Sequence, residues 1–415
     1  MKSNRTDEDK QQSSEEQQGL RLLALLLQCA EYIAVDNLSD ATDLLLEATE
    51  LSSPFGSPPE RVAAYFAEAL RALIVSSCTG TFHSSSSLRP PSLYLKTQGF
   101  HSAFRSYNAI APMIKFSHFT ANQAMYDALQ GEERVHVIDL DIMQGLQWPG
   151  LFHILASRPS PKLLSLRLTG IGPNLGLLDQ TGCRLAEFAG SLGLPFEFKA
   201  VEGRIGEIRD DDVDGVLGLR AGEARVVQWM QHSLYDVTGS HDGTLKALAT
   251  MKPRLVTLIE QDQTMGSSSF SGRFVEALHY YSALFDALEE GIGGGGGGGD
   301  DLEEEWRHEV ERVLLGWEIR NIINSSSSST VINNNYTRWG EELLRAGFRH
   351  FSLGGGPAAQ AQLLLGMTAA KRGGRRGGGG YRLLLDENNG WLRLGWKDLS
   401  LLTASAWQWH PLPTQ

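Results

Sequence analysis

The feature that most constrains the fold is the stretch from Val135 to Pro149, in which a run of apolar residues ends in an acidic turn. Residues 135–142 have the composition of a strand that is buried on both faces. Pro149 then favours the first turn of a helix, because proline is tolerated at that position. A strand that leads directly into a helix is the first half of a β-α-β unit. Ligands of such sheets bind beyond the carboxyl ends of the strands, so the turn after Asp139 is a candidate site.

The same alternation of strands and helices continues beyond this turn. Right-handed crossovers would make successive strands parallel and place helices on both faces of the sheet. The C-terminal strands look like a meander added to this sheet, with residues 387–390 as a hairpin turn. Strands are predicted at 135–142, 163–169, 196–201, 225–229, 254–260, 348–353, 381–386 and 391–396, and helices at 149–157, 175–192 and 272–288. The pattern therefore predicts an α/β fold.

A helical cap is predicted before the first strand. Residues 1–18 are polar and charged, and we expect them to form a disordered tail. Ser57 and Glu60 make a capping box around a helix that begins with proline, and Thr120 and Gln123 repeat that spacing. The predicted helices cover 20–35, 40–51 with Ser39 as its cap, 58–73 and 99–129. One core with this cap would account for the whole length.

Composition limits the classes of partner. The 415 residues carry a formal net charge of −12, which disfavours direct binding to a phosphate backbone. No apolar run is long enough for a membrane span and the first residues do not resemble a secretory signal, so we expect a soluble intracellular protein. The three cysteines, Cys29, Cys78 and Cys183, are expected to be reduced and buried.

Low-complexity segments interrupt the pattern and are expected to be surface loops. They are residues 84–91, 293–299, 325–329 and 377–380. The basic cluster lies among glycines and is interpreted as a solvated hairpin tip; it comprises Lys371, Arg372, Arg375 and Arg376.

The turn after Asp139 lacks the glycine spacing of a dinucleotide site, Gly-x-Gly-x-x-Gly, because only Gly145 is in place. Residues 169–173 stand where an acid would bind a ribose. We therefore favour a structural role for Asp139 and Asp141, in capping a helix or bonding turn amides, over cofactor binding. If the crevice did hold a ligand, its lining would be Asp139, Asp141, Gln144, Gly145, Gln147, Gly170 and Gly172.

Catalytic and metal motifs are not found in the sequence. There is no Gly-x-Ser-x-Gly, His-Glu-x-x-His or Cys-x-x-Cys pattern. His118, His232 and His279 lie in aromatic or amphipathic surroundings, where hydrogen-bonded structural imidazoles are favoured. We predict no catalytic residue, no metal and no cofactor.

Two apolar clusters allow either a core or a docking interpretation. Residues 22–26 form a Leu-x-x-Leu-Leu helix, for which packing within the chain's own cap is favoured over a partner's groove. The C-terminal aromatic residues are likewise expected to lie mostly in the core; they are Trp317, Trp339, Trp391, Trp396, Trp407 and Trp409.

Several motifs together resemble the plant GRAS regulators. Residues 135–139, Val135, His136, Val137, Ile138 and Asp139, resemble the VHIID motif, with valine in place of the first isoleucine. Residues 273–282 and 318–320 resemble the PFYRE region, and Ser405, Ala406 and Trp407 match the SAW motif. Residues 231–239 and 394–407 resemble the SCARECROW branch of the family. The resemblance divides a single GRAS domain, 19–413, into leucine-rich region I (19–79), the VHIID region (98–163), leucine-rich region II (175–211), the PFYRE region (213–321) and the SAW region (322–413).

This resemblance implies a Rossmann-like, methyltransferase-related fold with a mostly parallel sheet, helices on both faces and an N-terminal helical cap. It implies a transcriptional regulator of plant development without enzymatic activity, located in the nucleus with room for a cytoplasmic pool. Such a protein would form a heterodimer with a SHORT-ROOT-like GRAS protein and dock on C2H2 zinc-finger proteins of the INDETERMINATE DOMAIN type. DNA would be contacted mainly through these partners, and no membrane would be involved.

The cap helices and the C-terminal aromatic region are the candidate partner surfaces. The residues chosen for them are Leu22, Leu23, Leu25, Leu26, Arg61, Glu68, Trp339 and Trp396. The alternative hypothesis is a small-molecule sensor or methyltransferase-like enzyme that uses the crevice. Direct DNA binding is a third hypothesis.

Overall fold

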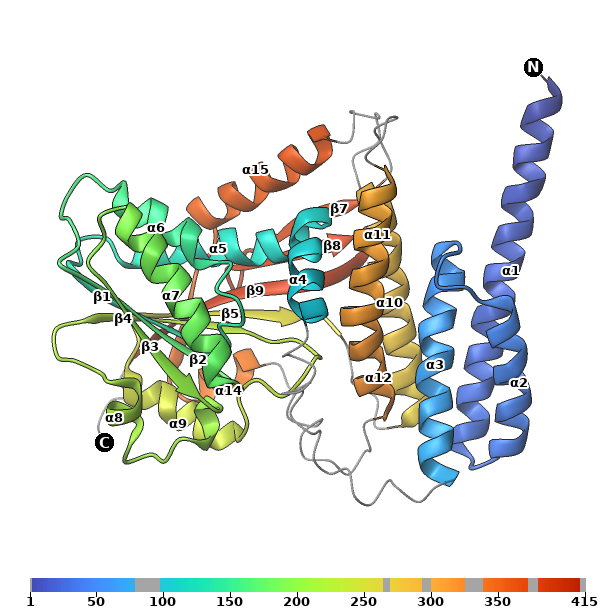
Figure 1. Cartoon of the computed structure of the whole chain (residues 1–415), viewed down its shortest axis with the longest axis horizontal. Helices are drawn as coiled ribbons and strands as arrows, with labels where there is room; N and C mark the ends of the chain where they lie inside the picture. Colours follow the sequence, from blue (N-terminus) through green and yellow to red (C-terminus); the bar gives the residue numbers. More distant parts are fainter. Residues whose placement is uncertain are drawn as a thin grey trace. The chain divides into compact units, whose positions relative to one another are not determined.

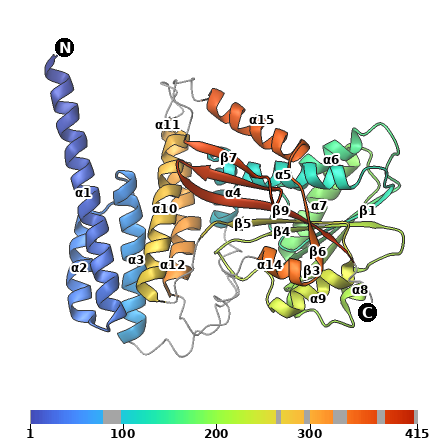
Figure 2. The same ribbon diagram turned by 180° about the vertical axis from the view of Figure 1, so that it is seen from behind.

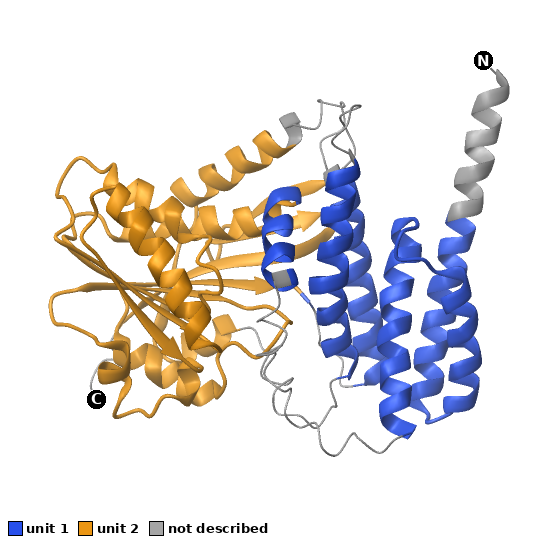
Figure 3. Ribbon diagram, in the orientation of Figure 1, with its two compact units in different colours: residues 1–89, 98–110, 263–336 blue, residues 90–97, 111–262, 337–415 orange. Residues whose placement is uncertain are grey.

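The computed structural model describes residues 2–78, 98–263, 269–292, 300–324, 339–371 and 380–410. The chain divides into two compact units, whereas the sequence predicted one core with a cap. Residues 1–89, 98–110 and 263–336 form the helical unit, and residues 90–97, 111–262 and 337–415 form the α/β unit (Figure 3). The loops predicted at 84–91, 293–299 and 325–329, and most of the basic and glycine cluster at 371–380, lie outside the described residues.

The α/β unit is built on a nine-stranded sheet with the order β3-β2-β1-β4-β5-β9-β8-β7, and β6 pairs with β9 (Figure 1). The first five strands pair in parallel, as the alternation of strands and helices predicted. They are β1 Arg134–Asp139, β2 Ser165–Gly172, β3 Phe196–Glu202, β4 Ala224–Met230 and β5 Leu255–Gln261. The antiparallel strands are β6 Phe348–Phe351, β7 Tyr381–Asp386, β8 Trp391–Trp396 and β9 Leu399–Trp409.

Helices cover both faces of the sheet, which confirms the predicted fold class. In both views α5, α6 and α15 lie above the parallel strands β1, β4 and β5, and α8, α9 and α14 lie below them (Figures 1 and 2). The helices of this unit are α5 Pro112–Ala128, α6 Trp148–Ala156, α7 Leu175–Ser191, the short η2 Ile205–Glu207, α8 Val213–Leu217, α9 His241–Met251, α14 Trp339–Arg345 and α15 Gly356–Lys371.

The helical unit confirms the predicted N-terminal helices and adds later segments to them. It comprises α1 Lys2–Ala34, α2 Leu38–Leu51, α3 Pro58–Cys78, α4 Gln98–Ile110, α10 Phe270–Ile292, α11 Asp300–Val310, the π-helical turn η3 Glu311–Leu315 and α12 Gly316–Asn324. Phe66 of α3 packs edge-on against Phe274 and Tyr281 of α10, so chain segments about 200 residues apart share one core.

Three predictions for the helices are wrong. Helix α1 begins at Lys2, so the predicted disordered tail is helical; the first 18 residues contain no glycine or proline and many good helix formers. Asn37, not Ser39, caps α2, because its side chain accepts from the Asp40 amide. The helix predicted over 99–129 is two helices, since Pro112 starts α5, and Thr120 and Gln123 lie inside α5, not at a cap.

The capping box before α3 is confirmed in a modified form. The Glu60 carboxylate accepts from the Ser57 amide at 2.7 Å and from the Ser57 hydroxyl at 2.9 Å. The Ser57 hydroxyl thus donates to Glu60, whereas in a standard capping box it would accept from the amide of that residue.

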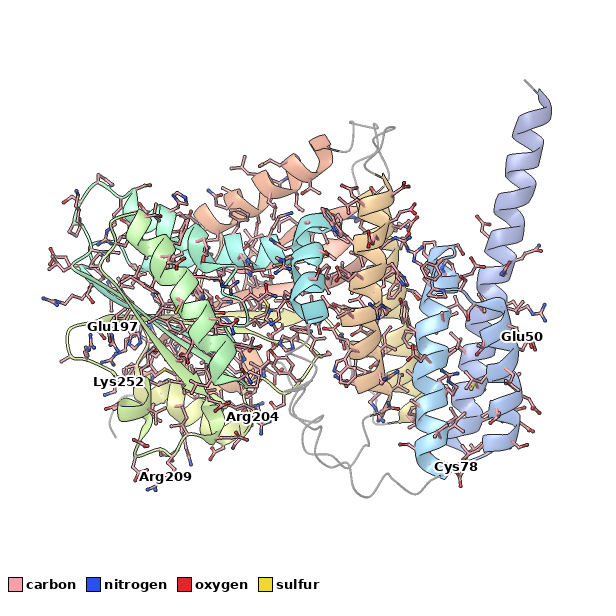
Figure 4. The ribbon with its side chains drawn as sticks, in the orientation of Figure 1. Glu50, Cys78, Glu197, Arg204, Arg209 and Lys252 are labelled. Carbon is pink, nitrogen blue, oxygen red and sulfur yellow. The ribbon has the colours of Figure 1, made fainter. Side chains whose placement is uncertain are left out.

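The cysteines divide into two groups. Cys29 is buried as predicted, and burial raises the pKa of its thiol to about 11. Cys78, at the end of α3 (Figure 4), is free and exposed. Cys183 is free and exposed as well, so the prediction of buried side chains is wrong for both. None of the helices in the described ranges is long and apolar enough to cross a membrane.

Candidate functional site

The candidate crevice lies where β1 and β4 are neighbours. The strand order β3-β2-β1-β4-β5 means that the chain moves outward from β1 in one direction and returns at β4 to continue in the other. In doubly wound sheets this switch point is where ligands bind, beyond the carboxyl ends of the strands. Residues 139–147 after β1 and residues 231–235 after β4 converge there.

Asp139 is buried at the end of β1 and bonds within its own turn. One carboxylate oxygen accepts from the Asp141 amide at 3.2 Å, and the other accepts from the indole nitrogen of Trp148 at 2.9 Å. Burial, reinforced by the neighbouring Asp141 carboxylate, raises the pKa of Asp139 to about 8. The predicted structural role, bonding a turn amide, is therefore what the geometry supports.

Asp141 closes the switch point from the other side. Its Oδ2 accepts from the Tyr235 hydroxyl at 2.6 Å and lies 3.0 Å from Nε2 of His232. The Tyr235 and His232 rings meet edge to face, with centroids 4.5 Å apart. Burial and the Asp141 charge hold the pKa of Tyr235 well above its ordinary value. This confirms His232 as a structural imidazole, and it ties the loop after β4 to the turn after β1.

A buried amide network fills the space beside these acids. Gln147 Nε2 donates to Asn122 Oδ1 at 3.1 Å and to Gln228 Oε1 at 3.2 Å. The Asn122 amide nitrogen donates to the Gln147 carbonyl at 3.1 Å, and the Thr257 hydroxyl donates to Gln228 at 2.6 Å. Gln144, the other glutamine of the turn, is buried as well. The two candidate glutamines are thus part of the interior.

The three candidate glycines make room for side chains of the chain itself. A Cβ atom at Gly170 would lie 2.8 Å from Cδ1 of Ile142, and one at Gly172 would lie 3.2 Å from Leu178. At Gly145, where φ is +63°, a Cβ atom would lie 3.0 Å from Leu185 and Thr181. In a nucleotide site such glycines let the backbone approach phosphates; here they let α7 and the turn approach the sheet.

The sequence reasoning missed the polar partners beneath the motif strand. His136 is fully buried, and its Nε2 lies 2.8 Å from the Thr169 hydroxyl. Arg167 donates to the buried Glu223 at 2.8 Å, which lies 3.6 Å from the other ring nitrogen of His136. Burial, with Arg167 and Arg225 nearby, lowers the pKa of His136 to about 3. The charged residue inside β2 was the available signal, because parallel strands are normally apolar on both faces.

The SAW motif is a core element. Ser405, Ala406 and Trp407 lie on β9, which pairs with β5, and the Trp407 indole donates to the Ser405 hydroxyl at 2.9 Å. Trp339, Trp396 and Trp407 are at most 2% exposed, and Trp317, Trp391 and Trp409 are half-buried, so the core prediction is confirmed for three of these six tryptophans.

The partner-surface candidates are mostly inaccessible in the chain itself. Leu22, Leu25 and Leu26 are buried and Leu23 is half-buried, so this helix packs in its own unit. Trp339 and Trp396 are buried too. Arg61 was expected to be exposed, and this is wrong: it is 1% exposed and its Nε lies 3.1 Å from both carboxylate oxygens of Glu311. Glu68 is exposed and pairs with Arg320. Their role in partner binding stays a prediction.

The remaining histidines differ from each other. Burial lowers the pKa of His118 to about 4, in keeping with a neutral interior imidazole. His279 is exposed, so the structural interpretation is wrong for it. Among the described residues, no group of three His, Cys, Asp or Glu side chains is placed to hold a metal ion.

Comparisons with known proteins agree with the motifs. The GRAS domain family model matches residues 22–408. The chain is 53% identical to Scarecrow-like protein 23 of Arabidopsis thaliana over 393 residues, which cover 94% of this chain and 90% of that protein. It is 50% identical to Protein SCARECROW of Ipomoea nil over 98% of this chain, which spans about half of that longer protein, 49%. The crystal structure of SCL7 in Oryza sativa superposes with a TM-score of 0.73 and 27% identity, over 93% of this chain and 99% of that one.

Proposed function

Because the chain belongs to the GRAS domain family, we propose that it is a nuclear transcriptional regulator of plant development that acts through protein contacts. In this proposal it pairs with a SHORT-ROOT-like GRAS protein and docks on zinc-finger proteins of the INDETERMINATE DOMAIN type, which supply most of the DNA contact. The names of its SCARECROW relatives and its acidic charge of −12 support this assignment.

The observation that carries the proposal is the filled switch point. A regulator that acts through protein contacts uses its surfaces and does not require a cavity for a reactant. At this place in the α/β unit, Asp139 and Asp141 bond inward to Trp148, His232 and Tyr235. A nucleotide would have to displace these contacts together with the Ile142 side chain that occupies the space over Gly170.

Isothermal titration of the full chain with S-adenosylmethionine tests this point. We expect no binding heat at ligand concentrations up to about 1 mM, which corresponds to about −4 kcal/mol of binding free energy. Micromolar binding that is abolished by Asp139→Ala would contradict the proposal and support the methyltransferase-like or sensor alternative. A gel-shift assay with the chain alone at low salt tests direct DNA binding in the same way, because electrostatic affinity is greatest there.

The partner surface is tested by charge reversal on the exposed pair Glu68–Arg320, which replaces the buried Arg61 as the informative position. The double variant Glu68→Lys/Arg320→Glu keeps an ion pair at these positions but exchanges the positive and the negative charge. In a pull-down with a SHORT-ROOT-like protein, we expect weaker capture by this variant. The matched control reverses Arg209–Asp211, an exposed pair of the α/β unit, of which Figure 4 labels Arg209. Equal capture of both variants would move the interface away from α3 and α12.

A further inference from the structure

The loop that joins α2 to α3 carries two Ser-Pro dipeptides four residues apart, Ser53–Pro54 and Ser57–Pro58. Proline-directed kinases select Ser-Pro dipeptides, because the proline after the serine has no N–H group to satisfy and holds a fixed φ. Both serines are half-buried, and Phe55 between them is 73% exposed. This loop is therefore presented at the surface of the helical unit.

The Ser57 hydroxyl lies at a junction of three elements. It donates to Glu60 Oε2 at 2.9 Å, and the same oxygen accepts from the Ser57 amide at 2.7 Å. The other Glu60 oxygen accepts from the side-chain amide of Gln18 in α1 at 3.0 Å. Gln18 also donates to the Leu51 carbonyl at the end of α2, at 3.3 Å. Glu60 thus joins the loop, α1 and α3 through one carboxylate.

The packing around this junction is close. A Cβ atom at Gly19 of α1 would lie 3.2 Å from Pro59, so α1 rests directly on the start of α3. On the other side of the loop, the Gly56 carbonyl accepts from Arg61 at 2.8 Å, and the Phe55 ring stacks on His308 with centroids 4.3 Å apart. Ser57 therefore lies between a contact to α1 and a contact to α11, and it is joined to α1 through Glu60.

We propose that Ser57 is a phosphorylation site for a proline-directed serine/threonine kinase, and that its phosphate releases Glu60 and loosens α1 at Gln18. In this step the Ser57 oxygen forms a bond to the γ-phosphorus of ATP. The bond from that phosphorus to the β,γ-bridging oxygen breaks and ADP leaves, while the hydroxyl proton passes to the kinase's catalytic base.

The charges determine the direction of the effect. Phosphoserine carries about −1.5 to −2 charges at pH 7 and cannot donate to Glu60 as the hydroxyl does. The new dianion stands where a carboxylate oxygen now lies 2.9 Å away, so the two repel. Pro58 and Pro59 have no amide hydrogen, so the backbone donor for the phosphate is the amide of Ser57 itself, which Glu60 releases. Glu60 leaves, and Gln18 loses its side-chain partner on α3.

The full chain, incubated with a mitogen-activated protein kinase and Mg-ATP, tests the proposal by tandem mass spectrometry. We expect phosphate on Ser57, and its loss in Ser57→Ala and in Pro58→Ala. The second variant keeps the hydroxyl and the Glu60 cap, so its result does not depend on a weakened helix start. Ser53–Pro54 of the same loop is the control dipeptide. No phosphate on Ser57, with or without phosphate on Ser53, would overturn the assignment.

Hydrogen exchange tests the consequence for α1. Amides of residues 16–24 are expected to exchange about fivefold or more faster in the phosphorylated chain than in the unmodified one. Glu60→Gln, which weakens the same junction without a phosphate, is expected to move exchange in the same direction. If phosphorylation at Ser57 leaves exchange in α1 unchanged, the proposed release of Glu60 is refuted.

Discussion

Replacing Gly170 with alanine tests whether side chains of the chain itself fill the crevice. A Cβ atom there would lie 2.8 and 2.9 Å from two methyl groups of Ile142 and 3.1 Å from Cζ of Phe198. Distances below 3.0 Å are not sustained, so the neighbours must move. The φ of Gly170 is not positive, so alanine suits the backbone and the penalty comes from packing alone. Overpacking of this kind costs about 1–3 kcal/mol.

A second substitution, Ile142→Ala, allows the interaction free energy between residues 142 and 170 to be measured. Ile142→Ala removes both close methyl groups and, by itself, leaves a cavity worth about 2–5 kcal/mol. In the double variant the alanine methyl at residue 170 enters the vacated space. The double variant should therefore be more stable than the sum of the single effects by about 1–3 kcal/mol.

Urea denaturation followed by tryptophan fluorescence measures these differences in the free energy of unfolding. The dependence of that free energy on urea concentration should be the same in all variants, which shows that they unfold in the same transition. Gly190→Ala in α7 is the control, because a Cβ atom there meets nothing within 4 Å. It should gain about 0.5–1 kcal/mol from helix propensity. Additivity within about 0.5 kcal/mol, or a Gly170→Ala variant as stable as the control, would refute the filled crevice.

Three further predictions concern charged and thiol groups. The pKa of Asp139 in the folded chain is raised to about 8. Stability should therefore fall as pH rises from about 4 to 8, because ionisation of this carboxyl is disfavoured in the folded state. Between pH 5 and pH 8 the melting temperature of Asp139→Asn should fall less than that of the parent chain. Arg61→Ala should destabilise the helical unit by about 3–5 kcal/mol in chemical denaturation, because the buried Glu311 then keeps only the longer contact to Arg307, at 3.4 Å. A loss below about 1 kcal/mol would mean that the Arg61–Glu311 ion pair is dispensable. Ellman's reagent should react with the two exposed thiols, Cys78 and Cys183, in the native chain, and with all three thiols in denaturant. Reaction of all three before unfolding would contradict the burial of Cys29.

The parallel strands were predictable because their signal is local. Residues 135–139 combine β-branched side chains with burial on both faces, and the start of α6 at Trp148 follows them. The predicted strand boundaries were wrong where glycine residues belong to a strand. The predicted strand ended at residue 169, yet residues 170–172 extend β2, where Gly170 leaves room for the Ile142 side chain.

Other failures came from patterns that tertiary context overrides. Thr120 and Gln123 have the spacing of a capping box but lie inside α5, because Pro112 had already started that helix. Strand β9, residues 399–409, was not predicted as a separate strand, although it connects the parallel strands to the meander through β5. Its central residues, 403–406, are small and buried, and small side chains give a weak strand signal.

The candidate site was predictable in its acids and not in their partners. The absent glycine spacing favoured a structural role for Asp139, which its bond to the Asp141 amide bears out. His232 and Tyr235 follow Asp141 by 91 and 94 residues, and only the pairing of β1 with β4 brings them together. No local pattern contains that pairing.

A strongly shifted pKa in a crevice is commonly taken as a sign of catalysis, and Asp139 shows why a second criterion is required. Its carboxyl is as perturbed as that of many general acids, with a pKa of about 8. A catalytic acid, however, must face space that a reactant can occupy. Both Asp139 oxygens face groups of the chain, Trp148 and the Asp141 amide, and Asp141 in turn faces Tyr235. The shift here follows from enclosing two acids in one interior, where they hold two loops together across the switch point.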